Sequence, residues 1–190
     1  MTHFPSLGEA AHLSDLFRRF PKAVAPLLEL HDAFLREPSA FSVAERELMA
    51  AYVSGLNACQ FCYGAHSLMA RAFGVEEAVL QAVLDDVDTA PIAPSLRPVL
   101  RLLNQLTREP AKVGKHLADA VLDAGWPEDA LYDVIAICAL YNYMNRILDG
   151  AGIKPGPEYD DPDPGMLKRR KEGTYVLWGR EAGLISQKSS

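Results

Sequence analysis

Asn57-Ala-Cys-Gln-Phe-Cys-Tyr-Gly-Ala-His66 is the most informative stretch of this sequence, because two of the chain's three cysteines stand three positions apart in it and a histidine lies four positions after the second. At about 100° per residue, Cys59, Cys62 and His66 fall within roughly 60° of one helical face. A separate apolar stripe runs beside that face and consists of Phe61, Ala65, Leu68, Met69 and Ala72. The spacing therefore predicts a helix over residues 58–73 that packs through this stripe and shelters a cysteine–histidine face.

The start of this helix adds chemistry to the geometry. Asn57 followed by Gln60 has the spacing of a capping box, which predicts that Cys59 lies in the first turn. A free thiol with a pKa of about 8.5 is only about 3% ionised at pH 7, whereas a cysteine at a helix N-terminus can have a pKa of roughly 3.5 to 7.5. Cys62 and His66 are one turn apart, close enough for the imidazole to exchange the thiol proton. Positions three apart on a helix are also close enough for a disulfide, so the pair is typical of a redox site.

The composition limits the other functions that the chain can have. With 190 residues, 49% of them hydrophobic, it is long enough for one substantial core and too short to require two. A net charge of −6 and a pI near 5.4 argue against a nucleic-acid surface, which needs a basic face. No apolar run approaches 18 residues, and the first ten residues do not resemble a signal peptide. We expect a cytoplasmic protein, in which a close cysteine pair is more often catalytic or metal-binding than structural.

Helical periodicity extends to residue 152, and no stretch alternates with the period of a strand. We therefore expect an all-α fold, with a compact multi-helix domain over residues 1–152 and an irregular C-terminal tail over residues 153–190. Ser42 and Glu45 form a capping box, and Pro21 and Pro127 suit the first position of a helix. The expected helices cover residues 13–20, 21–35, 43–56, 58–73, 76–84, 96–107, 114–122 and 127–148.

The composition changes after Lys154, where prolines, an acidic cluster and a basic run at residues 168–171 follow one another. The acidic cluster consists of Asp160, Asp161 and Asp163. Residues 175–178, Tyr-Val-Leu-Trp, are too apolar for a segment that only meets water. We expect them to dock on the domain or on a neighbouring subunit.

The order Glu-x11-Cys-x2-Cys-x3-His, formed by Glu47, Cys59, Cys62 and His66, resembles the alkylhydroperoxidase D-like branch of the carboxymuconolactone decarboxylase superfamily, and most closely its peroxidase-related proteins. The stretches Leu-Thr-Arg-Glu-Pro at residues 106–110 and Asn-Arg at residues 145–146 are also similar, and the resemblance covers about residues 20–152. One position departs from the pattern, because alkylhydroperoxidase D itself has a histidine where this chain has Phe61.

The resemblance implies a compact AhpD-like domain that reduces hydroperoxides while Cys59 and Cys62 cycle between dithiol and disulfide. It implies that His66 and Glu47 belong to a proton relay; a helical wheel alone places Glu47 off the main apolar stripe of its helix. It further implies an external dithiol or thiol-protein reductant and a homo-oligomer, either trimer or hexamer. From its place one turn before His66, Cys62 is our choice for the attacking thiol, with Cys59 more exposed and resolving, although the reverse order stays open. The sequence contains no glycine-rich phosphate-binding loop, so we expect no bound organic cofactor.

Several alternatives remain at this level. Cys59, Cys62 and His66 suit zinc if Glu47 or His116 completes the set, but three ligands within two turns of one helix make a closed tetrahedral site hard to assemble, so we expect no metal. A lactone decarboxylase-like enzyme and a non-catalytic helical interaction module are the other two classes. Cys138 has apolar neighbours and is expected in the core. Asn145 and Arg146 either reach the pocket or make other contacts, and the remaining histidines, His3, His12, His31 and His116, are expected on the surface.

Overall fold

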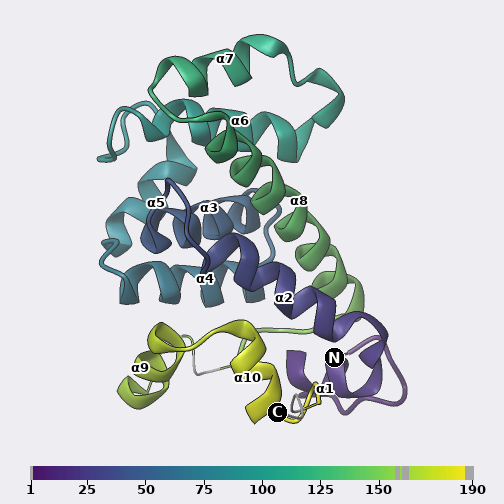
Figure 1. Ribbon diagram of the computed structural model, residues 1–190. Helices are drawn as coiled ribbons and strands as arrows, with labels where there is room; N and C mark the ends of the chain where they lie inside the picture. The colour runs from purple at the N-terminus through teal and green to yellow at the C-terminus, as the bar shows by residue number, and fades with distance from the viewer. Residues whose placement is uncertain (1, 157–158, 160–162, 187–190) are drawn as a thin grey trace.

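The computed structural model describes residues 2–156, 159 and 163–186, and across these residues the chain forms helices and no strands (Figure 1). The all-α prediction is therefore confirmed. Two short 3-10 turns lie at Pro21–Ala23 and Pro110–Lys112. The α-helices are α1 (Leu13–Arg19), α2 (Val24–Leu35), α3 (Val43–Leu56), α4 (Gln60–Ala72), α5 (Glu77–Asp85), α6 (Leu96–Arg108), α7 (Lys115–Asp123), α8 (Glu128–Ala151), α9 (Pro164–Glu172) and α10 (Tyr175–Glu181).

Most helix ends are set by local signals. The Ser42–Glu45 capping box forms as predicted, since the Glu45 N–H donates to Ser42 Oγ at 3.2 Å and the Ser42 N–H donates to Glu45 Oε2 at 2.8 Å. Pro127 is the N-cap of α8, and Gly152 ends that helix with a left-handed φ of 71°. Pro21 opens a 3-10 turn that leads into α2.

Helix α3 lies at the centre of the molecule and packs against α2, α4, α5, α6 and α8. Every residue from Arg46 to Ser54 is buried. A single helical wheel finds only the broadest apolar face, so it placed Glu47 away from the packed side; the other neighbours of α3 cover that side and leave Glu47 0% exposed. The central position of α3 thus puts a carboxylate in the interior.

The joint between α3 and α4 corrects the predicted Asn57–Gln60 capping box. α3 ends in a Schellman motif, in which the Cys59 N–H donates to Ser54 O at 3.0 Å and the Ala58 N–H donates to Gly55 O at 2.9 Å. Ala58 takes the left-handed φ of 56° that this motif requires. α4 begins at Gln60, so Cys59 is its N-cap and does not lie in its first turn. A single residue closes one helix and opens the next.

The C-terminal segment is also more regular than expected, because it contains α9 and α10. Asp163 Oδ2 accepts the Met166 N–H at 2.6 Å at the start of α9, and Thr174 Oγ1 accepts the Leu177 N–H at 3.1 Å at the start of α10. These caps stabilise short helices whose composition alone indicates a tail. Asp160 and Asp161 of the acidic cluster lie outside the described residues.

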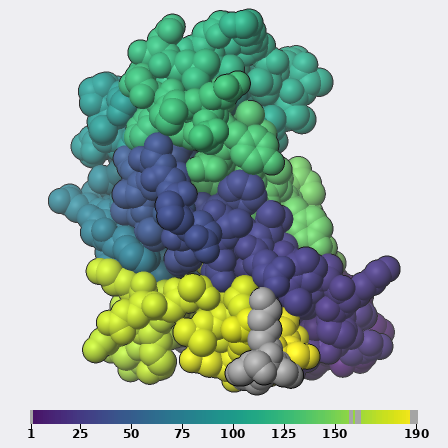
Figure 2. Space-filling view, in the orientation of Figure 1, coloured from purple at the N-terminus to yellow at the C-terminus, as the bar shows by residue number. Residues whose placement is uncertain are grey.

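The helices form a layered body with two distinct ends (Figure 1). α6 and α7 occupy one end, α1, α9 and α10 the other, and α8 runs between them. In Figure 2 the C-terminal residues lie against the N-terminal part of the chain, consistent with the packing of α10 on α2. Within the described residues, no helix combines the length and hydrophobicity that crossing a bilayer requires.

Candidate functional site

The two cysteines of the motif lie at the start of α4 and are hydrogen-bonded to each other. The hydrogen bond from the Cys62 thiol lowers the pKa of Cys59, against the opposing effect of burial and with help from the Cys62 backbone N–H. The same hydrogen bond and burial raise the pKa of Cys62. These opposite shifts in pKa favour Cys59 as the thiol that ionises first.

The burial of Cys59 corrects one expectation. Cys59 is 0% exposed and Cys62 is 3% exposed, so the residue nearer the helix start is not the more accessible one. The reason is the Schellman turn, which places Cys59 in the packed joint between two helices. Cys62, one turn further along α4, is the thiol that faces open space.

Asn145, on α8, connects the cysteine pair to α3. Its side chain hydrogen-bonds Cys62, which partly offsets the rise in the pKa of that thiol. Asn145 Nδ2 also donates to Ser54 Oγ at 3.1 Å, and Asn145 Oδ1 accepts from Asn57 Nδ2 at 2.8 Å. Arg146, the neighbour weighed with it, is exposed and donates to Asn142. Of these two residues, Asn145 therefore reaches the site.

The motif's glutamate and histidine meet in the interior. Glu47 Oε2 lies 2.6 Å from His66 Nδ1, and Glu47 Oε1 lies 2.6 Å from Arg36 Nη1. Burial alone would raise the pKa of Glu47, but His66 and then Arg36 outweigh it and hold the pKa below its ordinary value. Glu47 is therefore an ionised carboxylate between two nitrogen donors, which compensates the cost of burying it.

Glu47 fixes the orientation of His66. Because the ionised carboxylate accepts a hydrogen bond, Nδ1 of His66 carries a proton and Nε2 is the atom left for proton exchange. The ring of Tyr141 packs edge-on against the imidazole, with 4.4 Å between ring centroids. Cys62 makes its hydrogen bonds to Cys59 and Asn145 rather than to His66, but both Cys62 and His66 line the same cavity.

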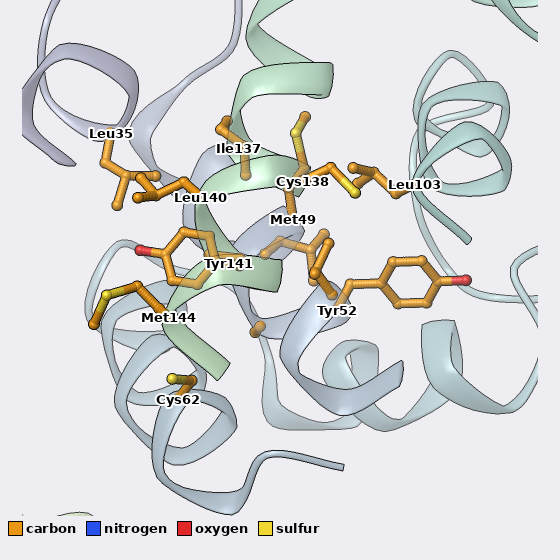
Figure 3. Packing of buried hydrophobic residues seen from close by; sticks show 14 of the residues in the cluster. Leu35, Met49, Tyr52, Cys62, Leu103, Ile137, Cys138, Leu140, Tyr141 and Met144 are labelled. Atoms are coloured by element: carbon orange, nitrogen blue, oxygen red, sulfur yellow. The ribbon is translucent and has the colours of Figure 1, made fainter. Parts of the chain in front are cut away.

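This cavity has a volume of about 580 Å³ and lies between the helical core and the C-terminal segment. Its walls are mostly apolar, with a smaller number of charged and polar groups. Figure 3 places Cys62 next to Tyr141 and Met144, and Cys138 away from them beside Met49 and Leu103. Apolar and aromatic residues that line it include Leu13, Phe17, Leu28, Phe61, Met69, Tyr141, Met144, Leu148, Tyr159, Met166, Tyr175 and Trp178.

His12 also lines this cavity, and so does a third histidine, His31, contrary to its expected place on the surface. It is 4% exposed, and its Nδ1 lies 2.7 Å from the Leu27 carbonyl oxygen, which accepts a hydrogen bond from it. Burial lowers the pKa of His31 to about 4. His31 is thus neutral at pH 7, and it was missed because α2 shows no chemical motif around it.

The groups of the alternative zinc site are not arranged for a shared metal ion. Among the described residues, no three histidine, cysteine or acidic side chains come close enough together to hold one. His116 lies on α7, at the other end of the molecule from α9 and α10 (Figure 1). Cys138 is 1% exposed within the core, which confirms its predicted place.

Arg36, Tyr141 and Tyr175 complete the surroundings of Glu47 and His66, and sequence reasoning assigned none of them to the site. Arg36 follows α2, and the two tyrosines come from α8 and α10, so no periodic pattern links them to α4. One indirect signal existed: a carboxylate predicted at a buried catalytic site requires a cation, and arginine is the usual partner.

Residues 21–105 match the model of the carboxymuconolactone decarboxylase family. A comparison with curated proteins gives no significant match. Among solved structures, a peroxidase-related protein from Ralstonia eutropha JMP134, described as an alkylhydroperoxidase AhpD core, is similar with a TM-score of 0.69 and 23% identity over 74% of each chain. A peroxidase-related protein from Silicibacter sp. TM1040 has a TM-score of 0.73 and 19% identity over 78% of each chain.

The debrominase Bmp8, solved in complex with 2,3,4-tribromopyrrole, has a TM-score of 0.63 and 18% identity over 75% of each chain. At these identities the structural matches establish the fold. The family match covers α2 to α5 and most of α6, including the motif and its glutamate.

Proposed function

We propose that this chain, whose residues 21–105 match the carboxymuconolactone decarboxylase family model and whose fold is AhpD-like, belongs to that superfamily and is a thiol-dependent peroxidase that reduces organic hydroperoxides through Cys59 and Cys62. One observation carries the proposal: two hydrogen-bonded thiols lie beside a buried glutamate–histidine pair, and one of them faces a large cavity. Each part of that arrangement has a role in a peroxidase cycle.

The first step uses the sulfur that faces the cavity. As Cys62 attacks the peroxide, its proton passes to Cys59; the new S–O bond forms, the O–O bond breaks, and the leaving alkoxide takes a proton to become the alcohol. Cys59 then loses its proton and attacks the sulfenic sulfur of Cys62, which expels hydroxide as water and closes the disulfide. One hydroperoxide and two thiols thus give one alcohol, one water and one disulfide. An external dithiol or thiol protein restores the pair.

His66 and Glu47 supply the proton transfers in this scheme. His66 lines the cavity and its Nε2 is not held by Glu47, so this atom can exchange a proton with the leaving oxygen while Glu47 holds the ring through Nδ1. Arg36 limits how much negative charge Glu47 places on the ring. Cys62 and His66 line the same cavity, so a peroxide bound there can meet both residues.

The cavity favours an organic substrate over hydrogen peroxide. A volume of about 580 Å³ is in the range that holds small organic ligands, and its mostly apolar wall would bind an alkyl or aryl group. Hydrogen peroxide would leave that wall unused. We therefore expect a higher kcat/KM for cumene hydroperoxide than for hydrogen peroxide.

Thiol titration tests the proposal. The reduced protein has three free thiols and should lose two of them with one equivalent of cumene hydroperoxide, releasing one equivalent of cumyl alcohol. Dithiothreitol should then restore both thiols. A lactone decarboxylase or a non-catalytic helical module would keep all three thiols, so that result would end the proposal.

Oligomer formation and a cytoplasmic location are further parts of the proposal. Three large side chains on the outer face of α8 stay exposed: Tyr132 at 64%, Ile135 at 41% and Tyr143 at 47%. Such a stripe fits a contact with a second copy in a trimer or hexamer. Light scattering of Tyr132→Lys should show a smaller particle than the wild type, and a monomeric wild type would contradict this part. A reducing compartment would keep the cysteines as thiols.

A further inference from the structure

Helix α10 is fixed to the core by one buried carboxylate. Asp32, on α2, accepts the Tyr175 N–H at 2.6 Å and the Val176 N–H at 3.0 Å, which are two of the free donors at the start of α10. Further along α10, the backbone of Gly179 lies so close to Leu28 that a Cβ there would be 2.3 Å from Leu28 Cδ1. The first turn of α10 therefore has a defined position over α2.

That position brings Tyr175 against the groups around Glu47. Its ring centroid lies 5.0 Å from the Arg36 guanidinium and 4.9 Å from the ring of His31. Its hydroxyl is hydrogen-bonded to Tyr141, whose own ring packs on His66. A side chain from the end of the chain thus touches both flanks of the Arg36–Glu47–His66 group.

Arg36 depends on such neighbours. Its guanidinium ion-pairs with Glu47 at 2.6 Å and is flanked by Tyr175 and, at 5.7 Å, by the ring of Phe73. A guanidinium over an aromatic face is stabilised most where water is excluded, and an ion pair weakens when water enters. Without the Tyr175 ring, the guanidinium would keep its hydrogen bond to Leu35 O at 2.9 Å but would lose one aromatic face and be open to water on that side.

We propose that Tyr175 is a positioning residue of the active site, and that Asp32 and α10 exist to place its ring over Arg36 and so keep the Arg36–Glu47–His66 group assembled. The C-terminal segment, which lies outside the family match, is then part of the catalytic unit. The proposal rests on the peroxidase function only for its kinetic readouts, because the reactivity of the thiols reports on the same group without any peroxide.

The experiment compares Tyr175→Ala, Tyr175→Phe and Asp32→Ala with wild type. Val176→Ala is the matched control, since it lies on the same turn of α10 but does not line the cavity. Disulfide formation is followed in single turnovers with hydrogen peroxide and with cumene hydroperoxide. Alkylation by iodoacetamide is followed across pH 5 to 9, and Tm is measured for each variant.

We expect Tyr175→Ala to slow both peroxides by about tenfold, because the proton relay loses its geometry for every substrate. The alkylation profile should move to higher pH, because the charged group beside the thiol pair loses its arrangement. Tyr175→Phe keeps the ring over Arg36 and should restore most of the rate. Asp32→Ala should reproduce Tyr175→Ala, because the Asp32 side chain holds the start of α10 and contacts none of the side chains of Arg36, Glu47 and His66. Val176→Ala should match wild type in both readouts.

Each other outcome overturns the proposal. If only cumene hydroperoxide slows in Tyr175→Ala, the residue is merely a cavity wall. If Tyr175→Phe is as slow as Tyr175→Ala, the hydroxyl rather than the ring is responsible. If the alkylation profile of Tyr175→Ala equals that of wild type, the ring does not hold the group, whatever the peroxide rates are. A wild-type protein that reduces no peroxide would instead refute the peroxidase function and leave the alkylation comparison intact.

Discussion

Cys62 and Cys138 are both buried and both lie beside an asparagine of α8, but their other neighbours differ. Each is hydrogen-bonded by an asparagine of α8, Asn145 for Cys62 and Asn142 for Cys138. Asn57 connects the two, since its Nδ2 donates to the side-chain oxygens of both asparagines, at 2.8 and 3.1 Å. Cys138 otherwise meets Thr107 at 3.3 Å, and burial raises its pKa.

Cys62 differs from Cys138 in the groups that surround it in addition to the asparagine. It has a second thiol as hydrogen-bond partner, a cavity on one side and an ionised glutamate with its histidine nearby. Under the proposed function we therefore expect burial and an amide hydrogen bond alone to leave Cys138 inert, and a charge network with room for a substrate to make Cys62 reactive. Four measurements can break or sharpen this contrast.

Serine substitutions should give the largest effect. Cys59→Ser and Cys62→Ser should each abolish multiple turnover of cumene hydroperoxide, because neither variant can close the disulfide. Cys138→Ser should keep nearly all of the activity, since that sulfur does not line the cavity. Persistent turnover in either motif variant, measured with excess dithiothreitol, would remove the dithiol mechanism and with it the contrast.

Acid should destabilise the protein through His31, which lines the same cavity as Cys62. Burial lowers the pKa of His31 from 6.5 to about 4, so the unfolded chain binds a proton more readily between these values. The stability from a neutral His31 is complete above pH 6.5 and falls as the pH drops to 4, by about 3 kcal/mol. The depressed pKa of Glu47 adds a loss that begins only below its unfolded value near 4.5.

Urea unfolding at pH 7.5 and at pH 4.5 measures this loss. His31→Gln should show a clearly smaller difference between the two conditions than wild type. If the free energy of unfolding falls by the same amount between these pH values in His31→Gln and in wild type, other groups cause the acid sensitivity. The buried titratable groups around the cavity of Cys62 would then not explain it.

Removing the charge on Glu47 should lower the peroxidase rate at neutral pH by about tenfold to a hundredfold. Glu47→Gln keeps the shape of the side chain but removes the negative charge that holds His66, so the thiol pair should react with iodoacetamide at higher pH. Glu45→Gln is the control, because Glu45 only caps α3 and should cost some stability with an unchanged alkylation profile. If Glu45→Gln shifts the alkylation profile and Glu47→Gln does not, Glu45 rather than Glu47 is the carboxylate that acts on the thiol pair.

The asparagine pair should give the smallest effect. One hydrogen bond is worth about 1 kcal/mol, so Asn145→Ala should slow the peroxide step by about fivefold, while Asn142→Ala should leave it unchanged. Mass spectrometry of alkylated peptides can follow Cys62 and Cys138 separately in each variant. Equal effects of the two substitutions would mean that the Asn57 link spreads the damage and that the two environments are not independent.

The sequence predicted the parts of this structure that depend on neighbours along the chain. The Ser42–Glu45 box, the α3 and α4 helices and the common face of Cys62 and His66 all follow from spacings within a few turns. The resemblance added Glu47, whose distance from His66 spans two helices. Such features are encoded locally or in a motif.

Other parts could not be read in this way because they arise when distant segments meet. Arg36, Tyr141 and Tyr175 reach Glu47 and His66 from three separate places in the chain. The Schellman turn at Ala58 could not be recognised from the sequence, because the left-handed position of this motif is usually a glycine. The caps of α9 and α10 were visible as single residues, but proline and charge dominated the composition around them.

The joint at Ala58 and Cys59 also explains why the numbers of residues between the motif positions matter. Asn57, Ala58 and Cys59 are the residues between α3 and α4. Ala58 and Cys59 close the Schellman motif of α3 and Cys59 is also the N-cap of α4, so this turn has no spare residue that could absorb an insertion. One extra residue after Glu47 would rotate the rest of the hairpin by about 100° and turn His66 away from its carboxylate. The intervals of eleven, two and three residues therefore determine whether the glutamate, the cysteines and the histidine of this helical hairpin come together. A natural or designed relative that keeps the cysteines but changes the first interval should retain two thiols without a relay between them.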